Sequence, residues 1–126
     1  MISLNVKSLD APDEVKGRTH LVTLNNAKVA RAVFEHGWRW SVHSKPVLGG
    51  ESCRTAHIGY VIAGRLGIRM DNGVEGRVEP GDAFEIPPGH DAWVIGDEPC
   101  TIVEFFPLPP NRPNSESGPL SKCPGK

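Results

Sequence analysis

The stretch Glu51-Ser-Cys-Arg-Thr-Ala-His57-Ile-Gly-Tyr-Val-Ile-Ala-Gly64 decides the fold, together with Gly81-Asp-Ala-Phe-Glu-Ile-Pro87-Pro-Gly89-His90-Asp-Ala-Trp93. The first stretch places a carboxylate, a thiol and an imidazole before and at the start of a short apolar run. That run, residues 57–63, predicts a strand buried on both faces. The second stretch alternates turn and strand signals, because Pro and Gly punctuate two short apolar segments, and it brings in a second imidazole.

The rest of the chain repeats this pattern of short strands and tight turns. Trp38, Trp40 and Val42 alternate with polar residues, which is the period of a strand with one buried face. Asp71-Asn-Gly73 is a hairpin signal, and Glu79-Pro-Gly-Asp82 has the residues of a type II turn. Further strands are expected at 29–34, 65–70, 74–78, 83–86, 91–95 and 100–106. Together they predict an all-β sandwich or barrel.

Length and composition narrow the class of protein. A chain of 126 residues is one domain, and 14 Gly with 12 Pro fit many turns rather than long helices. The net charge of -1 argues against a nucleic-acid binder, and no apolar run is long enough to span a membrane. The N-terminus lacks a signal-peptide pattern, and three cysteines make a disulfide framework unexpected. We therefore expect a cytoplasmic protein whose partners include neither nucleic acid nor a membrane.

The glycine and proline spacing of the two stretches resembles that of the cupins. Their motifs are commonly written G-x5-H-x-H-x3,4-E-x6-G and G-x5-P-x-G-x2-H-x3-N. Here Glu51-x-Cys53-x3-His57-x6-Gly64 reproduces the first motif from its first histidine onward, and Gly81-x5-Pro87-x-Gly89 reproduces half of the second. The chain is similar to a small single-domain bacterial cupin of the RmlC-like type. It shares the runs Cys-x3-His-x-Gly-Tyr-Val and Pro-Gly-His-Asp-Ala-Trp with an uncharacterised subgroup of them.

This resemblance implies a fold and an organisation of the chain. The fold is a double-stranded β-helix, or jelly-roll barrel, over residues 28–106. Residues 1–27 would be an N-terminal extension partly packed on the barrel, and 107–126 a flexible Pro-rich tail. The resemblance also implies a homodimer and a small-molecule ligand.

Cupins usually hold their metal with three histidines and a glutamate. Other residue types stand at the matching positions of this chain. The two histidines of the first motif fall on Glu51 and Cys53, and the glutamate falls on His57. The histidine of the second motif falls on Ala92, which cannot bind a metal. His90 lies two residues earlier and faces the same side if the strand is already extended there.

Cys53, His57 and His90 are therefore the predicted metal ligands. A thiolate with imidazoles suits a divalent transition metal, with Zn, Fe, Ni and Mn as candidates and Cu as a further one. Three further residues, Glu51, His43 and Tyr60, are candidates for lining the cavity or supporting a ligand. The structural alternative is a small buried cysteine, a core imidazole and a histidine that caps its own turn.

Two functions follow from this site. The first is a metal-dependent small-molecule enzyme of the dioxygenase, isomerase or lyase type, in which the metal acts as Lewis acid or oxygen activator. The second is a non-catalytic cupin that senses a small ligand or a metal. The altered ligand set favours the second, and the retained donors favour the first.

Overall fold

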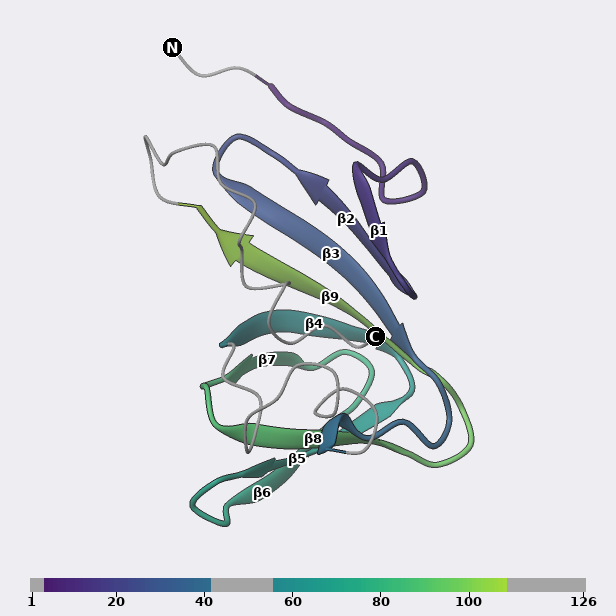
Figure 1. Ribbon diagram of the computed structural model, residues 1–126, viewed down its shortest axis with the longest axis vertical. Coiled ribbons are helices and arrows are strands. Elements are labelled where there is room, and N and C mark those ends of the chain that lie inside the picture. The colour runs from purple at the N-terminus through teal and green to yellow at the C-terminus, as the bar shows by residue number, and fades with distance from the viewer. Residues whose placement is uncertain (1–3, 42–55, 109–126) are drawn as a thin grey trace.

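The computed structural model describes residues 4–41 and 56–108, and its regular elements in these ranges are strands, apart from helical backbone at Trp40 and Ser41. Figure 1 shows them arranged as two antiparallel sheets. The elements are β1 (Glu14–Lys16), β2 (Thr19–Thr23), β3 (Ala27–Phe34), β4 (His57–Ala63), β5 (Arg65–Met70), β6 (Glu75–Val78), β7 (Ala83–Ile86), β8 (His90–Ile95) and β9 (Cys100–Pro107). The prediction of an all-β fold is confirmed.

The larger sheet has the strand order β1-β2-β3-β9-β4-β7, and the smaller sheet has the order β6-β5-β8. The first two strands of the chain continue the larger sheet beyond β3, because β2 pairs with β3 along its whole length. The predicted extension at residues 1–27 therefore contributes strands to the larger sheet. No helix of the described ranges is long and apolar enough to cross a membrane.

The turns between strands follow the local sequence. In the turn at Glu79–Asp82, the Asp82 amide donates to the Glu79 carbonyl at 2.9 Å. Gly81 has a φ of 93°, which is the left-handed value that the third residue of a type II turn requires. The Asp71-Asn-Gly73 hairpin joins β5 to β6 as predicted, with the Met70 amide donating to the Val74 carbonyl at 2.8 Å. The hairpin makes β5 and β6 neighbours in the smaller sheet, whereas the Glu79–Asp82 turn carries the chain from β6 to β7 of the larger sheet.

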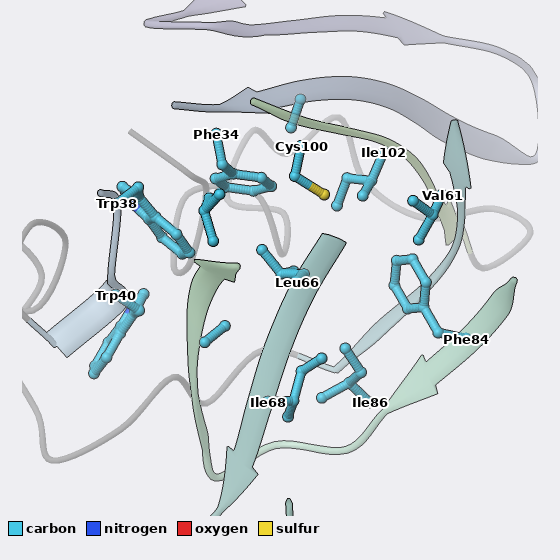
Figure 2. Packing of buried hydrophobic residues seen from close by; sticks show 13 residues of the cluster. Phe34, Trp38, Trp40, Val61, Leu66, Ile68, Phe84, Ile86, Cys100 and Ile102 are labelled. Atoms are coloured by element: carbon cyan, nitrogen blue, oxygen red, sulfur yellow. The ribbon is translucent and has the colours of Figure 1, made fainter. Parts of the chain in front are cut away.

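The core lies between the two sheets, where alternate residues of each strand point inward. Figure 2 shows its apolar side chains, among them Val61, Leu66 and Ile102. Burying a side chain of this size contributes about 1.5–3 kcal/mol. The indole rings of Trp38 and Trp40 are also buried. The strand predicted around them is not formed in the described residues, where Arg39 makes an isolated bridge to Trp93 and the backbone of Trp40 and Ser41 is helical.

Strand β4 corrects one prediction. Its buried residues alternate with exposed ones, so the strand is buried on one face rather than on both. Ile58, Tyr60 and Ile62 are about half exposed on the outer face, whereas His57, Gly59 and Val61 face the core. The prediction was wrong because both faces of the strand carry apolar residues. An exposed apolar residue looks the same in the sequence as a buried one.

Gly59 shows how tightly the inner face of β4 is packed. A Cβ added there would lie 2.3 Å from the Val103 carbonyl oxygen and 2.7 Å from the Phe84 ring. Both contacts are far shorter than any real Cβ allows. The glycine that the sequence places in this apolar strand therefore permits close approach of the neighbouring strands.

Candidate functional site

The two described histidines of the predicted site lie at the same end of the barrel. His57 is the first residue of β4, and His90 is the first residue of β8. Their ring centroids are 5.1 Å apart, with the ring planes at 74°. Both side chains are buried, with exposed fractions of 6% and 3%. The fold thus joins two residues that are 33 positions apart in the sequence.

Strand register explains why His90 reaches this position. In β8, His90, Ala92 and Val94 are buried and the residues between them are less so, which is the alternation of an extended strand. His90 is paired with Met70 of β5, on the same inner face. The predicted orientation of His90, on the same side as Ala92, is therefore confirmed.

The hydrogen bond of His90 fixes which ring nitrogen carries a proton. Its Nδ1 lies 2.9 Å from the carbonyl oxygen of Pro87. A carbonyl oxygen only accepts, so Nδ1 carries the hydrogen and donates it. Two causes lower the pKa of His90 from 6.5 to about 4: burial, which is the larger, and the nearby imidazole of His57. The ring is therefore neutral at pH 7, and the lone pair of Nε2 is available to an incoming ligand or metal.

Glu104 completes the site, and the sequence reasoning missed it. It lies on the inner face of β9, is 6% exposed, and its Oε2 lies 3.0 Å from Nδ1 of His57. The contact brings the two groups to ion-pair distance without the alignment of a hydrogen bond. A carboxylate facing Nδ1 favours a proton on that nitrogen. The lone pair of the His57 ring is then on Nε2, the atom that could ligate a metal.

A signal for Glu104 was present in the sequence. In the run Cys100-Thr-Ile-Val-Glu-Phe-Phe106, the glutamate shares the parity of Cys100, Ile102 and Phe106, all of which are buried. A carboxylate at an inward position of an apolar strand is rarely buried without a partner. The alternation of inward and outward residues along this strand therefore identifies Glu104 as an inward-facing carboxylate.

The remaining candidates divide into two groups. Glu51, Cys53 and His43 lie outside the described residues. Tyr60 is described, and its prediction as a residue of the cavity is wrong. It is 45% exposed on the outer face of β4, because it is three positions from His57 and successive side chains of a strand alternate between faces.

The spacing of the two imidazoles is compatible with a shared metal ion. A metal about 2.1 Å from each ring nitrogen lies about 3.2 Å from each ring centroid, and a tetrahedral angle then separates the centroids by roughly 5.2 Å. The observed separation is 5.1 Å. Within residues 4–41 and 56–108, however, no group of three His, Cys, Asp or Glu side chains is placed to hold a metal together. The described part of the site supplies two candidate ligands, His57 and His90.

A cavity of about 330 Å³ lies between β5, β6 and β7. It is lined mainly by apolar side chains, including Ile68, Met70, Val78, Phe84 and Ile86. Two of these residues are the cross-strand partners of the site histidines, since Met70 pairs with His90 and Ile86 with His57. A cavity of this size, apolar and next to a few polar groups, suits a small organic molecule.

Comparison with known proteins supports the fold. No protein-family model and no curated protein matches the sequence. Among solved structures, an RmlC-like cupin from Shewanella frigidimarina matches with a TM-score of 0.56 and 17% identity, covering 86% of this chain and 95% of that one. A protein with a double-stranded beta-helix domain from Klebsiella pneumoniae matches with a TM-score of 0.52 and 20% identity, covering 86% and 93%.

A cupin domain from Bordetella pertussis matches as well, with a TM-score of 0.51 and 17% identity over 72% of this chain and 92% of that one. Identities this low are informative about the fold and not about the chemistry. The fold expected from the glycine and proline spacing, a double-stranded β-helix of the RmlC-like cupin type, is confirmed.

Proposed function

We propose that this chain, which has the cupin double-stranded β-helix fold, binds a divalent transition metal in its barrel and acts there on a small molecule. The observation that carries the proposal is the pair of buried imidazoles, His57 and His90, 5.1 Å apart. In each ring Nδ1 faces an acceptor, the Pro87 carbonyl for His90 and the Glu104 carboxylate for His57. Both rings can then offer Nε2 to one ion.

Cys53 is the proposed third protein ligand. It lies four residues before His57 in the sequence, at the position that the cupin motif gives to a histidine. Two imidazoles and a thiolate favour Zn, Fe or Ni over a hard ion such as Mn. When bound, the metal would supply Lewis acidity or oxygen activation to a ligand at an open coordination position.

The residues around the ion would have separate tasks. Glu104 would hold the imidazole of His57 in the tautomer that a metal requires. The Pro87 carbonyl does the same for His90. The mainly apolar cavity is lined by Met70 and Ile86, the cross-strand partners of the two histidines, and would accommodate the carbon skeleton of the ligand. These roles fit an isomerase, a lyase or a dioxygenase.

Metal content tests the proposal directly. We would purify the protein without an affinity tag and measure bound metals by mass spectrometry for wild type and for His57→Ala, His90→Ala and Cys53→Ala. His36→Ala is the matched control, because His36 is an exposed histidine at the Gly96 turn. We expect about one metal per chain in wild type and the control, and at least tenfold less in the three variants. Substoichiometric metal in wild type would refute the proposal.

A non-catalytic cupin that senses a ligand or a metal is the second candidate. The buried carboxylate of Glu104 already faces His57, with Oε2 3.0 Å from Nδ1. Glu104 is therefore already engaged by an imidazole and is poorly placed to transfer a proton to a ligand. Metal-loaded protein incubated with a mixture of small organic acids, followed by proton NMR, separates the two functions. New resonances that His90→Ala abolishes indicate an enzyme, whereas line broadening without product indicates a sensor.

A further inference from the structure

The inner face of the barrel carries one charged group that the proposed metal site does not use. The buried polar residues of the described ranges are Thr19, Lys28, His57, His90 and Glu104. Lys28 is the one lysine or arginine among them, with an exposed fraction of 8%. Burying a cation is energetically unfavourable unless it has a partner, so the burial of Lys28 requires a physical reason.

Strand register places Lys28 at the same end of the barrel as the histidines. In β3 the buried residues are Lys28, Ala30, Ala32 and Phe34, which face inward together. Ala30 pairs with Glu104 and Lys28 pairs with Phe106 on β9. β9 also pairs with β4, the strand that begins at His57. The backbones of Lys28 and His57 are thus two strand spacings apart, or about 10 Å.

The surroundings of Lys28 leave its charge unbalanced. No ion pair or hydrogen bond joins its ammonium to a neighbouring residue in the described structure. The nearest inward carboxylate along the register, Glu104, faces His57 instead. The ammonium nitrogen is not completely sealed from solvent. A cation with low-dielectric walls and no counterion attracts an anion.

We propose that Lys28 is the anion-binding residue of this site, and that the ligand is a small organic acid. One carboxylate of the ligand would bind the Lys28 ammonium while the opposite end reaches the His57–His90 pair. The second half of this statement rests on the proposed metal site, whereas the first half does not. A dicarboxylate suits the separation, because the four-carbon stem of lysine shortens the distance that the ligand must bridge.

The competing explanation is a structural lysine whose stem packs on apolar neighbours while its head reaches water. Phe106, directly opposite Lys28, offers such a surface. Lys28→Met separates the two explanations, because methionine retains an apolar stem and removes the charge. Lys28→Arg retains the charge, and Lys16→Met removes a half-buried lysine of β1 as the matched control.

Calorimetric titration with oxalate, malonate and succinate tests the proposal, with neutral succinamide as the uncharged probe. Each is titrated into metal-free protein and into protein loaded with Zn²⁺. We expect at least one diacid to bind both forms, Lys28→Met to weaken it tenfold or more in both, and Lys28→Arg and Lys16→Met to remain within about threefold of wild type. Succinamide should not bind. Circular dichroism and thermal melting establish that each variant is folded.

The outcomes separate this proposal from the metal site. Diacid binding that depends on Lys28 in metal-free protein supports the anion site even if the protein binds no zinc. Zinc binding at His57 and His90 with diacid affinities unaffected by Lys28→Met overturns the anion site and leaves the metal site standing. Failure of all three diacids to bind either form also overturns it.

Discussion

The two ends of the barrel interior differ in chemistry although the same strands build them. β3 places Phe34 at one end and Lys28 at the other. β9 does so with Cys100 and Glu104, and β8 with Val94 and His90. We call the first the apolar end (Phe34, Leu66, Val94, Cys100) and the second the site end (Lys28, His57, His90, Glu104). The pleat of a strand determines which face a residue occupies. The position of the residue along the strand determines whether it lies at the apolar end or at the site end.

The two ends contribute to the free energy of unfolding in opposite directions. Buried polar and charged groups at the site end cost stability unless each is partnered. Apolar burial at the other end contributes in the opposite direction. Phe34 and Trp38, for example, pack with ring centroids 4.5 Å apart, and Cys100 is fully buried. Burial also raises the pKa of the Cys100 thiol to about 11, so it remains a neutral apolar group at pH 7.

The largest expected effect comes from breaking the apolar part of the core. Ile102 is 1% exposed, so Ile102→Ala leaves a cavity between the sheets. We expect the free energy of unfolding to fall by about 2–5 kcal/mol, measured by urea denaturation. Ile58→Ala, at an exposed position of the adjacent strand, is the control and should change it by less than about 1 kcal/mol. Equal losses in the two variants would contradict the assignment of inner and outer faces.

The pH dependence of stability tests the site end in metal-free protein. The pKa of His90 is about 4 in the folded chain, against 6.5 for an ordinary histidine. Between these values the unfolded chain binds more protons, so acid favours unfolding. The stabilising contribution is complete above pH 6.5 and is lost as the pH falls through 4, by up to about 3 kcal/mol.

His90→Gln should remove this contribution while keeping a neutral polar group in place. We would measure urea unfolding of both proteins from pH 7.5 to pH 4 and compare the slopes. The wild type should lose more stability on acidification than the variant. Parallel curves would mean that His90 titrates normally and that the site end is wetter than its burial indicates.

A smaller effect is expected from the carboxylate that faces His57. Glu104→Gln keeps the shape of the side chain and removes its charge, so it weakens the preference for a proton on Nδ1 of His57. We expect metal affinity to fall about 10- to 100-fold at unchanged stoichiometry, measured by competition with a chelating dye. Glu85→Gln, at an exposed position of β7, should leave the affinity unchanged. An unchanged affinity in Glu104→Gln would assign Glu104 a purely structural role.

The smallest effect on the folded chain is expected on the outer face of β4. Ile58, Tyr60 and Ile62 are exposed there, beside the exposed Phe105 of the neighbouring strand β9. Apolar patches of this kind often mark protein interfaces. The homodimer implied by the cupin resemblance stays a prediction. We expect Ile62→Lys to change the stability of the monomer by less than about 0.5 kcal/mol and to abolish a dimer, as measured by light scattering. Val15→Lys, at another exposed apolar position, should leave the dimer intact.

Much of the fold was predictable because turns and alternation are local properties. The Asp71-Asn-Gly73 hairpin, the Glu79–Asp82 turn and the strands that flank them are where the sequence predicts them. His90 was predicted to share a face with Ala92, and it does. Tyr60 and the face of β4 were predicted wrongly, because an apolar run does not reveal which of its faces a second sheet covers.

The amino-acid sequence by itself determined most of the strand pattern, the turns, and the presence of one imidazole at a strand start and a second directly after a turn. Only the tertiary structure decided that His57 meets Glu104, that His90 lies beside His57, and that Lys28 faces the same end. The physical reason is that alternation is fixed within each strand by the pleat, whereas the meeting of side chains depends on register between strands far apart in the sequence. Register is set by the packing of the whole core, so no single stretch contains it.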